Sequence, residues 1–495
     1  MMSVAQRLRQ KLLDLAIHGK LVSQDPKDEP AGELLARIRK ARSQLLVAKG
    51  IKKEDQIIPV GDDEVPFELP KEWTWCRFRE LGLLTGGHTP SMANPKFWNG
   101  DVLWVTSKDM KRKYIDDTGA KITALGAGEL TILEPGAILM CTRSGILRRT
   151  FPLAIAAKEL TINQDQRALT LALPEMAEYV YSALCALEPL ILAEYRKTGT
   201  TVESIIWDKF VDMPFPLPPF AEQKRIVEKL NAMLKEATRV AEGMERLAQL
   251  RKKARAKILD LAIRGKLVKQ EKSDESASEL LKRIAAEKAK LVAEKKITKE
   301  KPLPPITVDE MPFDLPKGWS WCRLRDVVSE GPRNGYSPAP VDYDTGVRKL
   351  ILSATTRGVF DGSAYKFIDA NIPSDSYLWL QKGDLLIQRS NSLEYLGISC
   401  IYDGPDKAFV YPDLMMKVRV NGAILLEYLD FALKSATTHK YYVDHATGTA
   451  GNMPKINGEV VSKTPIPLPP LSEQHRIVAK VKEMLAACDA FGGEW

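Results

Sequence analysis

Cysteine pairs, metal-ligand spacings and nucleotide-binding loops are lacking in this 495-residue sequence. The six cysteines are scattered, with no C-x-x-C and no histidine nearby, so neither a disulfide framework nor a zinc site is expected. Because no G-x-x-x-x-G-K-[ST] occurs, nucleotide hydrolysis is not supported either. The sequence therefore predicts a chain that is not an enzyme and holds no metal or cofactor of its own.

Long apolar runs and a strong local charge excess are also lacking. We find no run of about 18 apolar residues, and the first residues carry charges where a signal peptide is apolar, which predicts a soluble, cytoplasmic protein. The net charge is +8, but residues 80–215 and 326–466 each carry 14 Lys and Arg against 16 Asp and Glu. Composition alone therefore does not predict a nucleic-acid binder.

Several stretches occur twice in the chain. An internal repeat has to be interpreted before the fold, and this one predicts two similar halves. The pairs are KLLDLAIHGKLV (11–22) with KILDLAIRGKLV (257–268), PFELPKEWTWCRFRE (66–80) with PFDLPKGWSWCRLRD (312–326), and FPLPPFAEQKRIVEKL (215–230) with IPLPPLSEQHRIVAKV (466–481). Between these stretches the halves share only a faint outline, such as EPGAILMCTRSG (134–145) with QKGDLLIQRSNS (381–392).

The repeated frame predicts long helices. Apolar residues recur with the 4,3 spacing of a coiled-coil seam, interrupted once at Arg251, at Ile226, Leu230, Met233, Ala237, Val240, Met244, Leu247, Ala254, Ile258 and Leu261. This pattern predicts a helix of about 45 residues, roughly 65 Å long. Parts of the same seam recur near the chain ends, at Leu8, Leu12 and Leu15 and at Ile477, Val481, Met484, Cys488 and Phe491. We predict that the two terminal segments together form a second helix antiparallel to the central one.

The predicted fold class is α+β (mixed α/β), with two globular domains separated by two long antiparallel coiled-coil helices and related by a pseudo-twofold internal repeat. The predicted division is an N-terminal helical region at 1–65, a globular domain at 66–215, a central region with the long helix, a second helix and a linker at 216–311, a second globular domain at 312–466, and a distal helix at 467–495. Trp73, Trp75, Trp319 and Trp321 open the globular domains, where we favour core packing over base stacking.

The duplicated LPP-x-x-EQ-x-RIV, each copy opening a long helix after a variable domain, resembles the conserved-region motifs of type I restriction-modification system specificity (S) subunits, the HsdS family. The resemblance implies that 66–215 and 312–466 are target recognition domains, each recognising one part of a split, asymmetric DNA site. It also implies two methyltransferase (M) partners that form an adenine-N6 methylase using S-adenosylmethionine. Two restriction (R) partners using ATP and Mg would complete the restriction enzyme, with the helices as the docking region.

Candidate DNA contacts are polar residues that follow strand-like apolar runs. In the first domain they are Thr106, Ser107, Lys108, Asp109, Lys111, Arg112, Lys113, Arg143, Ser144, Arg148, Arg149, Asn163, Gln164 and Gln166. In the second domain they are Ser353, Thr355, Thr356, Arg357, Gln388, Arg389, Ser390 and Asn391. Arginine pairs bidentately with guanine, whereas lysine mainly contacts phosphate, so Arg143 and Arg389 are the strongest candidates.

Other interpretations remain open at this point. Any exposed loop is rich in such residues, so each candidate could simply be a solvated side chain. Tyr441 and Tyr442 beside His439 and His445 are interpreted as a packed helix end, not as an acid-base cluster. The rival function is a coiled-coil scaffold whose globular domains bind protein; its association with DNA would be weak and insensitive to salt, whereas specific DNA binding weakens steeply with salt.

Overall fold

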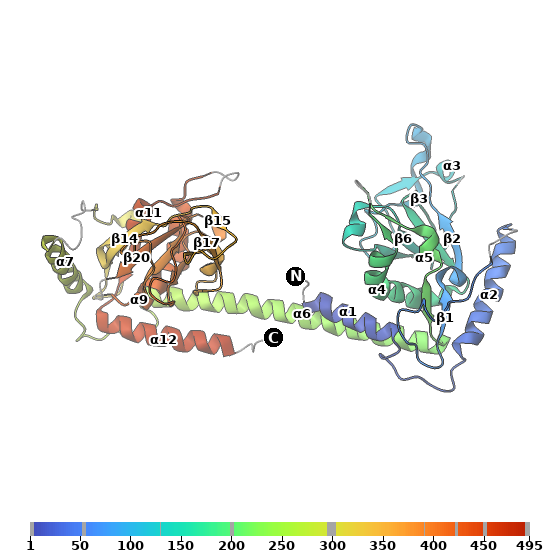
Figure 1. Cartoon of the computed structure of the whole chain (residues 1–495), viewed down its shortest axis with the longest axis horizontal. Helices are drawn as coiled ribbons and strands as arrows, with labels where there is room; N and C mark the ends of the chain where they lie inside the picture. Colours follow the sequence, from blue (N-terminus) through green and yellow to red (C-terminus); the bar gives the residue numbers. More distant parts are fainter. Residues whose placement is uncertain are drawn as a thin grey trace. The chain divides into compact units, whose positions relative to one another are not determined.

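The computed structural model describes residues 4–51, 56–128, 130–198, 202–294, 303–390, 392–420, 424–448 and 453–490. The chain divides into two compact units, Met1–Glu245 and Arg246–Trp495, and each is described by itself. Both units combine a globular head of strands and short helices with longer helices (Figure 1). The mixed helix and sheet class predicted from the sequence is therefore confirmed.

The head of the first unit is built on a five-stranded sheet in the order β2-β9-β6-β7-β4. These strands are β2 (Gly82–Gly86), β9 (Gln166–Leu171), β6 (Ile138–Cys141), β7 (Leu153–Ala156) and β4 (Tyr114–Ile115). Successive residues of a strand point to opposite faces, and in the central strand Ile138 and Met140 join one buried cluster while Leu139 and Cys141 join another. The sheet is thus covered on both faces.

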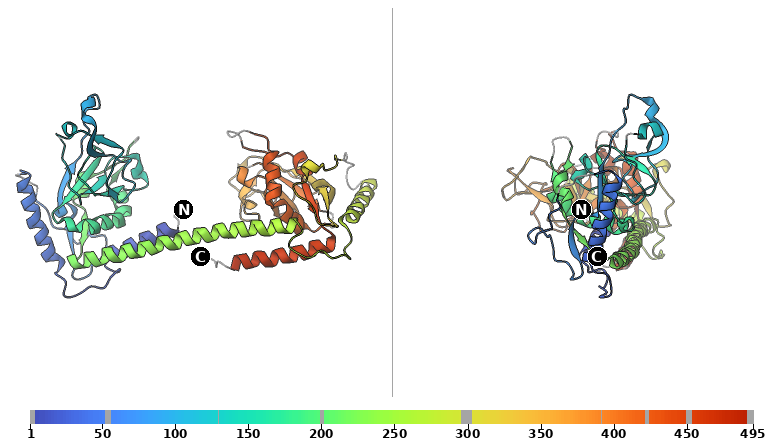
Figure 2. Two further views of the ribbon diagram at one scale, coloured as in Figure 1. Left: turned by 180° about the vertical axis from the view of Figure 1, so that it is seen from behind. Right: turned by 90° about the vertical axis from the view of Figure 1, so that its right-hand side faces the viewer.

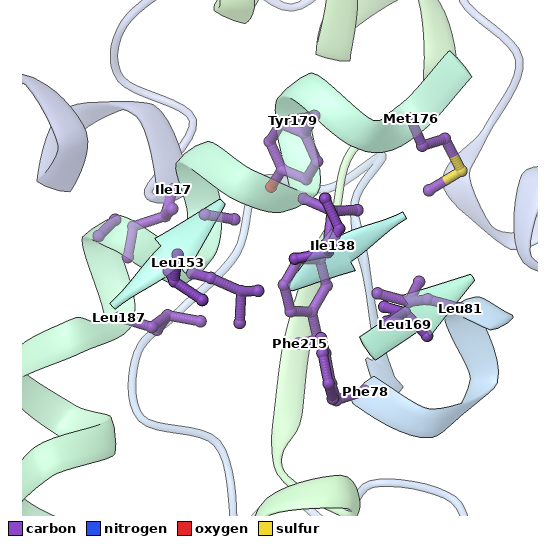
Figure 3. Packing of buried hydrophobic residues seen from close by; sticks show 14 of the residues in the cluster. Ile17, Phe78, Leu81, Ile138, Leu153, Leu169, Met176, Tyr179, Leu187 and Phe215 are labelled. Atoms are coloured by element: carbon purple, nitrogen blue, oxygen red, sulfur yellow. The ribbon is translucent and has the colours of Figure 1, made fainter. Parts of the chain in front are cut away.

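Two elements provide this cover. Helix α4 (Ala177–Glu194) packs on one face, where Tyr179 and Leu187 lie among Ile138, Leu169 and Phe215 (Figure 3). A three-stranded sheet of β5 (Ala120–Ile122), β3 (Trp98–Val105) and β8 (Leu160–Ile162) covers the other face. The shorter elements are β1 (Thr74–Arg77), η1 (Phe78–Leu81), η2 (Pro95–Phe97), α3 (Ala124–Ala127), η3 (Gly145–Arg148), η4 (Pro174–Met176), β10 (Arg196–Lys197), β11 (Ser204–Ile205), α5 (Trp207–Val211) and β12 (Pro214–Leu217), the last paired antiparallel with β1.

Helix α4 is long and apolar, although Glu178 and Glu188 interrupt its apolar residues. With the preceding turn it forms a helical stretch, Pro174–Glu194, that is long and apolar enough to cross a membrane by length and composition. More than half of this stretch is buried inside the first unit, because its apolar residues cover the central sheet. The helix therefore occupies the position of a core helix.

The head of the second unit repeats the scheme with different strand lengths. A four-stranded sheet has the order β14-β20-β18-β19, and a three-stranded sheet has the order β15-β17-β16. The elements are β13 (Ser320–Arg323), α8 (Leu324–Val327), β14 (Val328–Asn334), β15 (Pro340–Val341), β16 (Arg348–Leu350), η6 (Leu352–Ala354), β17 (Tyr365–Ile368), β18 (Leu385–Gln388), η7 (Leu393–Tyr395), β19 (Ser399–Ile401), β20 (Met415–Val420), α9 (Leu426–Leu433), α10 (Ala436–Asp444), α11 (Gly458–Ser462) and β21 (Pro465–Leu468). Tyr442 is fully buried in α10, as expected for a packed helix end.

The long helices are α1 (Val4–Ile17), α2 (Ala31–Ala48), α6 (Phe220–Ile263), α7 (Ala277–Ala293) and α12 (Leu471–Ala490), and η5 (Val308–Glu310) lies in the segment that leads into the second head. The 44-residue α6 begins directly after the Pro218-Pro219 pair, as the sequence predicts. In the second unit, Arg251 and Arg255 contact the last turn of α12, whereas Ile258 is buried in one cluster with Ile477 nearer its start. Helix α12 therefore runs antiparallel to this part of α6 (Figure 2).

Helix α1 differs from the narrow seam expected for it. Its buried residues are Leu12, Leu13, Ala16 and Ile17, a stripe broader than the two positions per heptad of a coiled coil, while Leu8 is exposed. The reason is that α1 packs against α4 of the head as well as against α6, and Gln10 donates a hydrogen bond to the carbonyl of Ala186.

The middle of the predicted seam is not covered by the described residues. Val240, Met244 and Leu247 are exposed, whereas Ala237 and Ile258 on either side are buried. Phe491, which was predicted to extend the seam, lies outside the described residues. The joint helix formed by the two chain ends therefore stays a prediction.

The repeated KL-x-DLAI-x-GKLV phrase is a helix end held against the head. Gly19 and Gly265 each follow a helix with φ of +63°, the left-handed conformation in which glycine commonly stops a helix. A Cβ atom at Gly19 would lie 2.3 Å from Cγ of Pro70, and one at Gly265 would lie 2.4 Å from Cγ of Pro316. Glycine is therefore required at both positions by backbone conformation and by space.

A buried glutamate joins this helix end to the EQ motif in each unit. In the first unit, Glu222 accepts hydrogen bonds from Trp73 Nε1 (3.0 Å) and Gln24 Nε2 (3.1 Å). In the second, Glu473 accepts from Trp319 Nε1 (2.9 Å) and Gln270 Nε2 (3.0 Å). Burial raises the pKa of both carboxyls. Trp73 and Trp319 are buried, which confirms the prediction of core packing for them, whereas Trp75 and Trp321 are half-buried.

A buried arginine clamps the linker to each head. Arg77 donates to the carbonyls of Ile58 and Pro59 and pairs with Glu64 at 2.6 Å. Arg323 donates to the carbonyls of Pro304 and Pro305 and pairs with Glu310 at 2.8 Å. The equivalent contacts fix the chain as it enters each head.

Acid is expected to weaken this clamp in the first unit. The hydrogen bond from Arg77 lowers the pKa of Glu64 from its ordinary 4.5 to about 2, so the stabilisation is present above pH 4.5 and is lost as the pH falls towards 2. Glu64→Gln should therefore be less stable than the unsubstituted protein in urea at pH 6, and this difference should shrink between pH 4.5 and 3. Glu68→Gln, at an exposed position four residues further along the chain, is the control. A difference that does not change with pH would contradict the prediction.

Candidate nucleic-acid interface

The ends of three strands meet at one edge of the first head. The turn between β8 and β9 joins them through backbone hydrogen bonds. The amide of Asn163 donates to Val105 at the end of β3, and the amides of Thr142 and Arg143, after β6, donate to Asp165. The end of β2 reaches the same turn, because the amide of His88 donates to Ile162. We call this surface the first edge; it presents the segments that contain Thr106, Arg143 and Gln164.

Arg143 is an available cation of the first edge. Its backbone is held by the hydrogen bond that its amide donates to the carbonyl of Asp165 and by β-bridge pairing with Ser204. Its side chain is exposed, and among the described residues it has no hydrogen-bond or ion-pair partner. A fixed backbone with an unpaired guanidinium can contact an anion or a base edge without first breaking an internal interaction.

The other arginines after β6 divide into paired and unpaired. Arg148 contacts Glu203 at 3.1 Å, and Arg196 contacts the same carboxylate at 2.7 Å. Glu203 is itself buried, so this carboxylate neutralises part of the positive charge. Arg149 is exposed without a described side-chain partner, and Ser144 accepts the amide of Ile146 as a helix cap.

The segment after β3 is structured by its own side chains. Asp109 accepts hydrogen bonds from the amide and the hydroxyl of Thr106, both at 2.8 Å. Within this turn Lys108 is exposed and Ser107 is half-buried. Asp109 and Thr106 therefore shape the turn, and Lys108 is the side chain free to contact a ligand.

Lys111, Arg112 and Lys113 do not belong to the first edge. Lys113 pairs with Glu178 at the start of α4, and Arg112 pairs with Asp116 at 3.0 Å. The adjacent β4 lies beside Ile155 of β7, which pairs with Ile138, at the opposite end of β6 from Arg143. The structure thus places these three residues on a separate surface.

Of the polar residues in the β8–β9 segment, Gln164 is exposed, whereas Asn163 and Gln166 are buried.

The second head has an edge built by equivalent hydrogen bonds. The amide of Arg389, directly after β18, donates to Leu414, and the amide of Ile456 donates to the carbonyl of Arg389. In the first head the amide of Ile205 donates in the same way to Thr142. Arg389 therefore occupies the position of Thr142, and its half-buried side chain is steered by a bond from Nε to the carbonyl of Ile456 (3.3 Å). We call this surface the second edge.

Three candidates of the second head are buried. Gln388 is fully buried and donates to the carbonyl of Leu352 and to the hydroxyls of Thr355 and Thr356. Thr355 is also fully buried, and Ser390 is almost so. Their placement corrects the assumption that the segments after the strands are exposed throughout: Gln388 ties η6 to the sheet, so Gln388 and Thr355 are structural.

The remaining candidates of the second head are more accessible. Ser353 and Arg357 are exposed and Thr356 is half-buried, while Asn391 lies outside the described residues. Arg357 lines a pocket together with Arg255 of α6 and Leu485 of α12, so it lies on the side of the head that faces the long helices.

The described residues offer little for other chemistry. No three His, Cys, Asp or Glu side chains within them are grouped so that they could hold a metal ion. What the edges offer instead are exposed arginine and lysine side chains on short, hydrogen-bonded segments. This arrangement suits contacts to phosphate and to base edges.

Sequence similarity settles the class of protein. The sequence profile described as "Type I restriction modification DNA specificity domain" matches residues 70–248 and 316–491, more than half of the chain. The chain belongs to this family. Its two specificity domains contain both edges and all of the candidate contacts, so its role is DNA recognition and not catalysis.

Named relatives of this specificity protein extend over almost its whole length. The type I restriction enzyme EcoEI specificity subunit of Escherichia coli is 27% identical, with 98% of this chain and 89% of the relative covered. The EcoAI specificity subunit of Escherichia coli is 29% identical over the same shares. A solved structure concerned with assembly of the type I R-M system has a TM-score of 0.52 at 19% identity, covering 86% of this chain and 93% of its own, which supports the fold.

One pair of segments at the edges was missed by the sequence analysis. GGHTPS at 86–91 and NGYSPA at 334–339 follow the first long strand of each head and reach the same turns as the candidates above. The two segments share only a four-residue pattern: a glycine, a residue with a ring, a residue with a hydroxyl group and a proline. So short a pattern is easily overlooked when the two halves are not aligned.

Proposed function

We propose that this chain is the DNA sequence-specificity subunit of a type I restriction-modification enzyme and recognises a bipartite, asymmetric DNA site. The observation that carries the proposal is that the two heads build their edges with equivalent backbone hydrogen bonds but place different side chains on them, such as Thr142 and Arg389. Two like scaffolds with unlike contact residues suit two half-sites of different sequence.

The proposed architecture follows the division predicted from the sequence. Residues 66–215 and 312–466 are the target recognition domains, and 1–65, 216–311 and 467–495 form the conserved helical regions. We propose that the helices pair as an antiparallel coiled coil under a pseudo-twofold repeat. The repeated joint of Glu222 with Trp73 and of Glu473 with Trp319 supports this arrangement, because each copy ties a long helix to its own head.

The proposed partners are double-stranded DNA, two M subunits and two R subunits in the cytoplasm. Adenine-N6 methylation with S-adenosylmethionine then belongs to the M subunits, and ATP and Mg to the R subunits. The support comes from relatives whose names describe specificity subunits of type I restriction enzymes. A protein-binding scaffold is not favoured, because the matched domains are DNA specificity domains.

The proposed DNA contacts are the exposed or half-exposed candidates of the two heads. They are Thr106, Ser107, Lys108, Arg143, Ser144, Arg148, Arg149 and Gln164 in the first head and Ser353, Thr356, Arg357 and Arg389 in the second. Lys111, Arg112 and Lys113 would form a second, phosphate-contacting surface. Gln388, Thr355 and Ser390 are left out because they are buried.

Mapping N6-methyladenine across a host genome tests the proposal. Cells that express this chain with its M partner should gain methylated adenines in one split motif with two unlike halves and a fixed unspecified gap. Cells with the M partner alone are the control and should lack that motif. A continuous motif, a palindromic motif, or no gain of methylation would each contradict the two-headed proposal.

A further inference from the structure

Each head carries a short loop with the order glycine, ring, hydroxyl, proline. In the first head it is Gly87-His88-Thr89-Pro90, after β2, and in the second it is Gly335-Tyr336-Ser337-Pro338, after β14. The two loops share no other sequence pattern. Their placement in the heads can nevertheless be compared hydrogen bond by hydrogen bond.

The backbone of the loop is anchored identically in both heads. The amide of Gly87 donates to Gln166 (3.2 Å) and that of His88 to Ile162 (3.0 Å). The amide of Gly335 donates to Met415 (3.2 Å) and that of Tyr336 to Tyr411 (2.9 Å). Gln166 and Met415 belong to β9 and β20, which pair with β6 and β18. Arg143 and Arg389 follow the ends of β6 and β18, so each loop borders its edge.

The glycine is fixed by the closeness of this contact. A Cβ atom at Gly87 would lie 2.1 Å from the carbonyl oxygen of Asn163, and one at Gly335 would lie 2.1 Å from that of Tyr411. Real Cβ atoms do not approach an oxygen so closely, so any other residue would push the loop away from the turn. Both heads therefore hold the loop against the turn at the same point.

The hydroxyl residue adds a second anchor. Thr89 Oγ1 hydrogen-bonds the side chain of Gln164, and Ser337 Oγ bonds Asp413 Oδ1 (2.5 Å) while accepting the amide of Asp413 (3.0 Å). Gln164 and Asp413 occupy the same place, two residues beyond the carbonyl that accepts the ring residue's amide. The ring residue is thus held from both sides by fixed neighbours.

The ring itself is left without a partner. The side chains of His88 and Tyr336 are exposed, and neither makes a hydrogen bond or ring contact within the described part of the chain. In the first head, even the Trp104 indole bonds the carbonyl of His88 and not its imidazole. The loop is thus anchored by backbone amides and by the hydroxyl of the following residue, while the planar side chain stays free. A contact residue held in this way has little conformational freedom to lose on binding.

We propose that His88 and Tyr336 are equivalent DNA-contacting, specificity-determining positions, each acting on the half-site bound by its own head. This inference rests on the proposed function. Imidazole and phenol differ in their donors and acceptors, so unlike rings at one fixed position give the two heads different base preferences. Gly87, Thr89, Gly335 and Ser337 are positioning residues that hold the rings.

The experiment uses the full chain assembled with its M partner and duplexes carrying the methylation motif. Binding is measured on the intact site and on two sites with one half scrambled. His88→Ala should weaken binding to the intact site about 5- to 150-fold, the range for losing one base-contacting side chain. The variant should also lose discrimination against scrambling of the half bound by the first head, while it keeps discrimination at the other half. Tyr336→Ala should give the mirror result, so each variant is the control for the other.

Two further measurements keep the outcome decisive. Both rings are exposed, so the midpoint of thermal unfolding of each variant should match that of the unsubstituted protein. If the midpoint of either alanine variant is lower, Tyr336→Phe and His88→Asn replace the alanine variants in the same assay. If the unsubstituted complex discriminates and the variants discriminate equally well, or if each variant weakens both halves alike, this inference is overturned and the proposed function stands. If the unsubstituted complex itself shows no sequence preference, both are overturned.

Discussion

Replacing Glu222 with alanine is expected to lower the free energy of unfolding by about 2–4 kcal/mol. The variant removes the acceptor of two hydrogen bonds, from Trp73 Nε1 and Gln24 Nε2, and leaves a buried indole donor unsatisfied. An unsatisfied buried donor costs about 1–3 kcal/mol, and bonds to a charged group contribute about 1.5–3 kcal/mol each. Burial raises the pKa of Glu222 because the carboxylate is partly desolvated in the folded protein. Removing the carboxylate also removes this desolvation cost, so the loss in free energy of unfolding should be smaller than the sum of the two contributions above.

Urea unfolding followed by tryptophan fluorescence measures this loss. Glu228→Ala is the matched control, because it makes the same change at an exposed position of the same helix. Trp73→Phe should cost less, and in a double-mutant cycle with Glu222→Ala the two losses should not add, since both remove one interaction. If Glu222→Ala is no more destabilising than Glu228→Ala, the joint does not stabilise the unit.

Arg143→Ala is expected to reduce recognition of one half-site by about 5- to 150-fold, or about 1–3 kcal/mol. The guanidinium is exposed and free of internal partners among the described residues, so its removal should leave the head intact and delete only a contact. Arg389→Ala should act on the other half-site. Its side chain bonds the carbonyl of Ile456, so this variant should also loosen the second edge slightly.

Binding to intact and half-scrambled duplexes separates these effects. Arg239→Ala is the control, since Arg239 is an exposed arginine of α6 paired only with Glu236 in the described chain. It should leave discrimination at both half-sites unchanged. Equal loss at both half-sites for Arg143→Ala would mean that this arginine contacts phosphate without recognising sequence.

The long helices and the repeated stretches were largely predictable from the sequence, because the patterns that indicate them extend over many residues. Strict 4,3 spacing over some 35 residues predicts a helix of the length of α6, and a twelve-residue repeat predicts equivalent structures in both halves. Trp73 and Trp319 were correctly expected in the core. Their bonds to Glu222 and Glu473 were not foreseen, since the partners lie about 150 residues apart in sequence.

The side-chain details of the edges were less predictable from the sequence. They depend on the exact residue at which each strand ends and on the elements that pack beside it. Side chains alternate along a strand, so a shift of one residue at a strand end moves a side chain to the other face. Gln388 therefore points inward, although the sequence predicted it among the exposed contact residues. The width of the buried stripe on α1 was likewise hidden, since it depends on the helix α4 that lies beside it.

The edges are assembled from main-chain amides and carbonyls, which every amino acid except proline supplies in the same form. Side chains on them can consequently be exchanged during evolution with little cost to folding, whereas the glycines and the buried glutamates cannot. New target sequences should therefore arise by a few substitutions on an unchanged scaffold, and natural variants with different targets should differ most at the residues that point out of these edges.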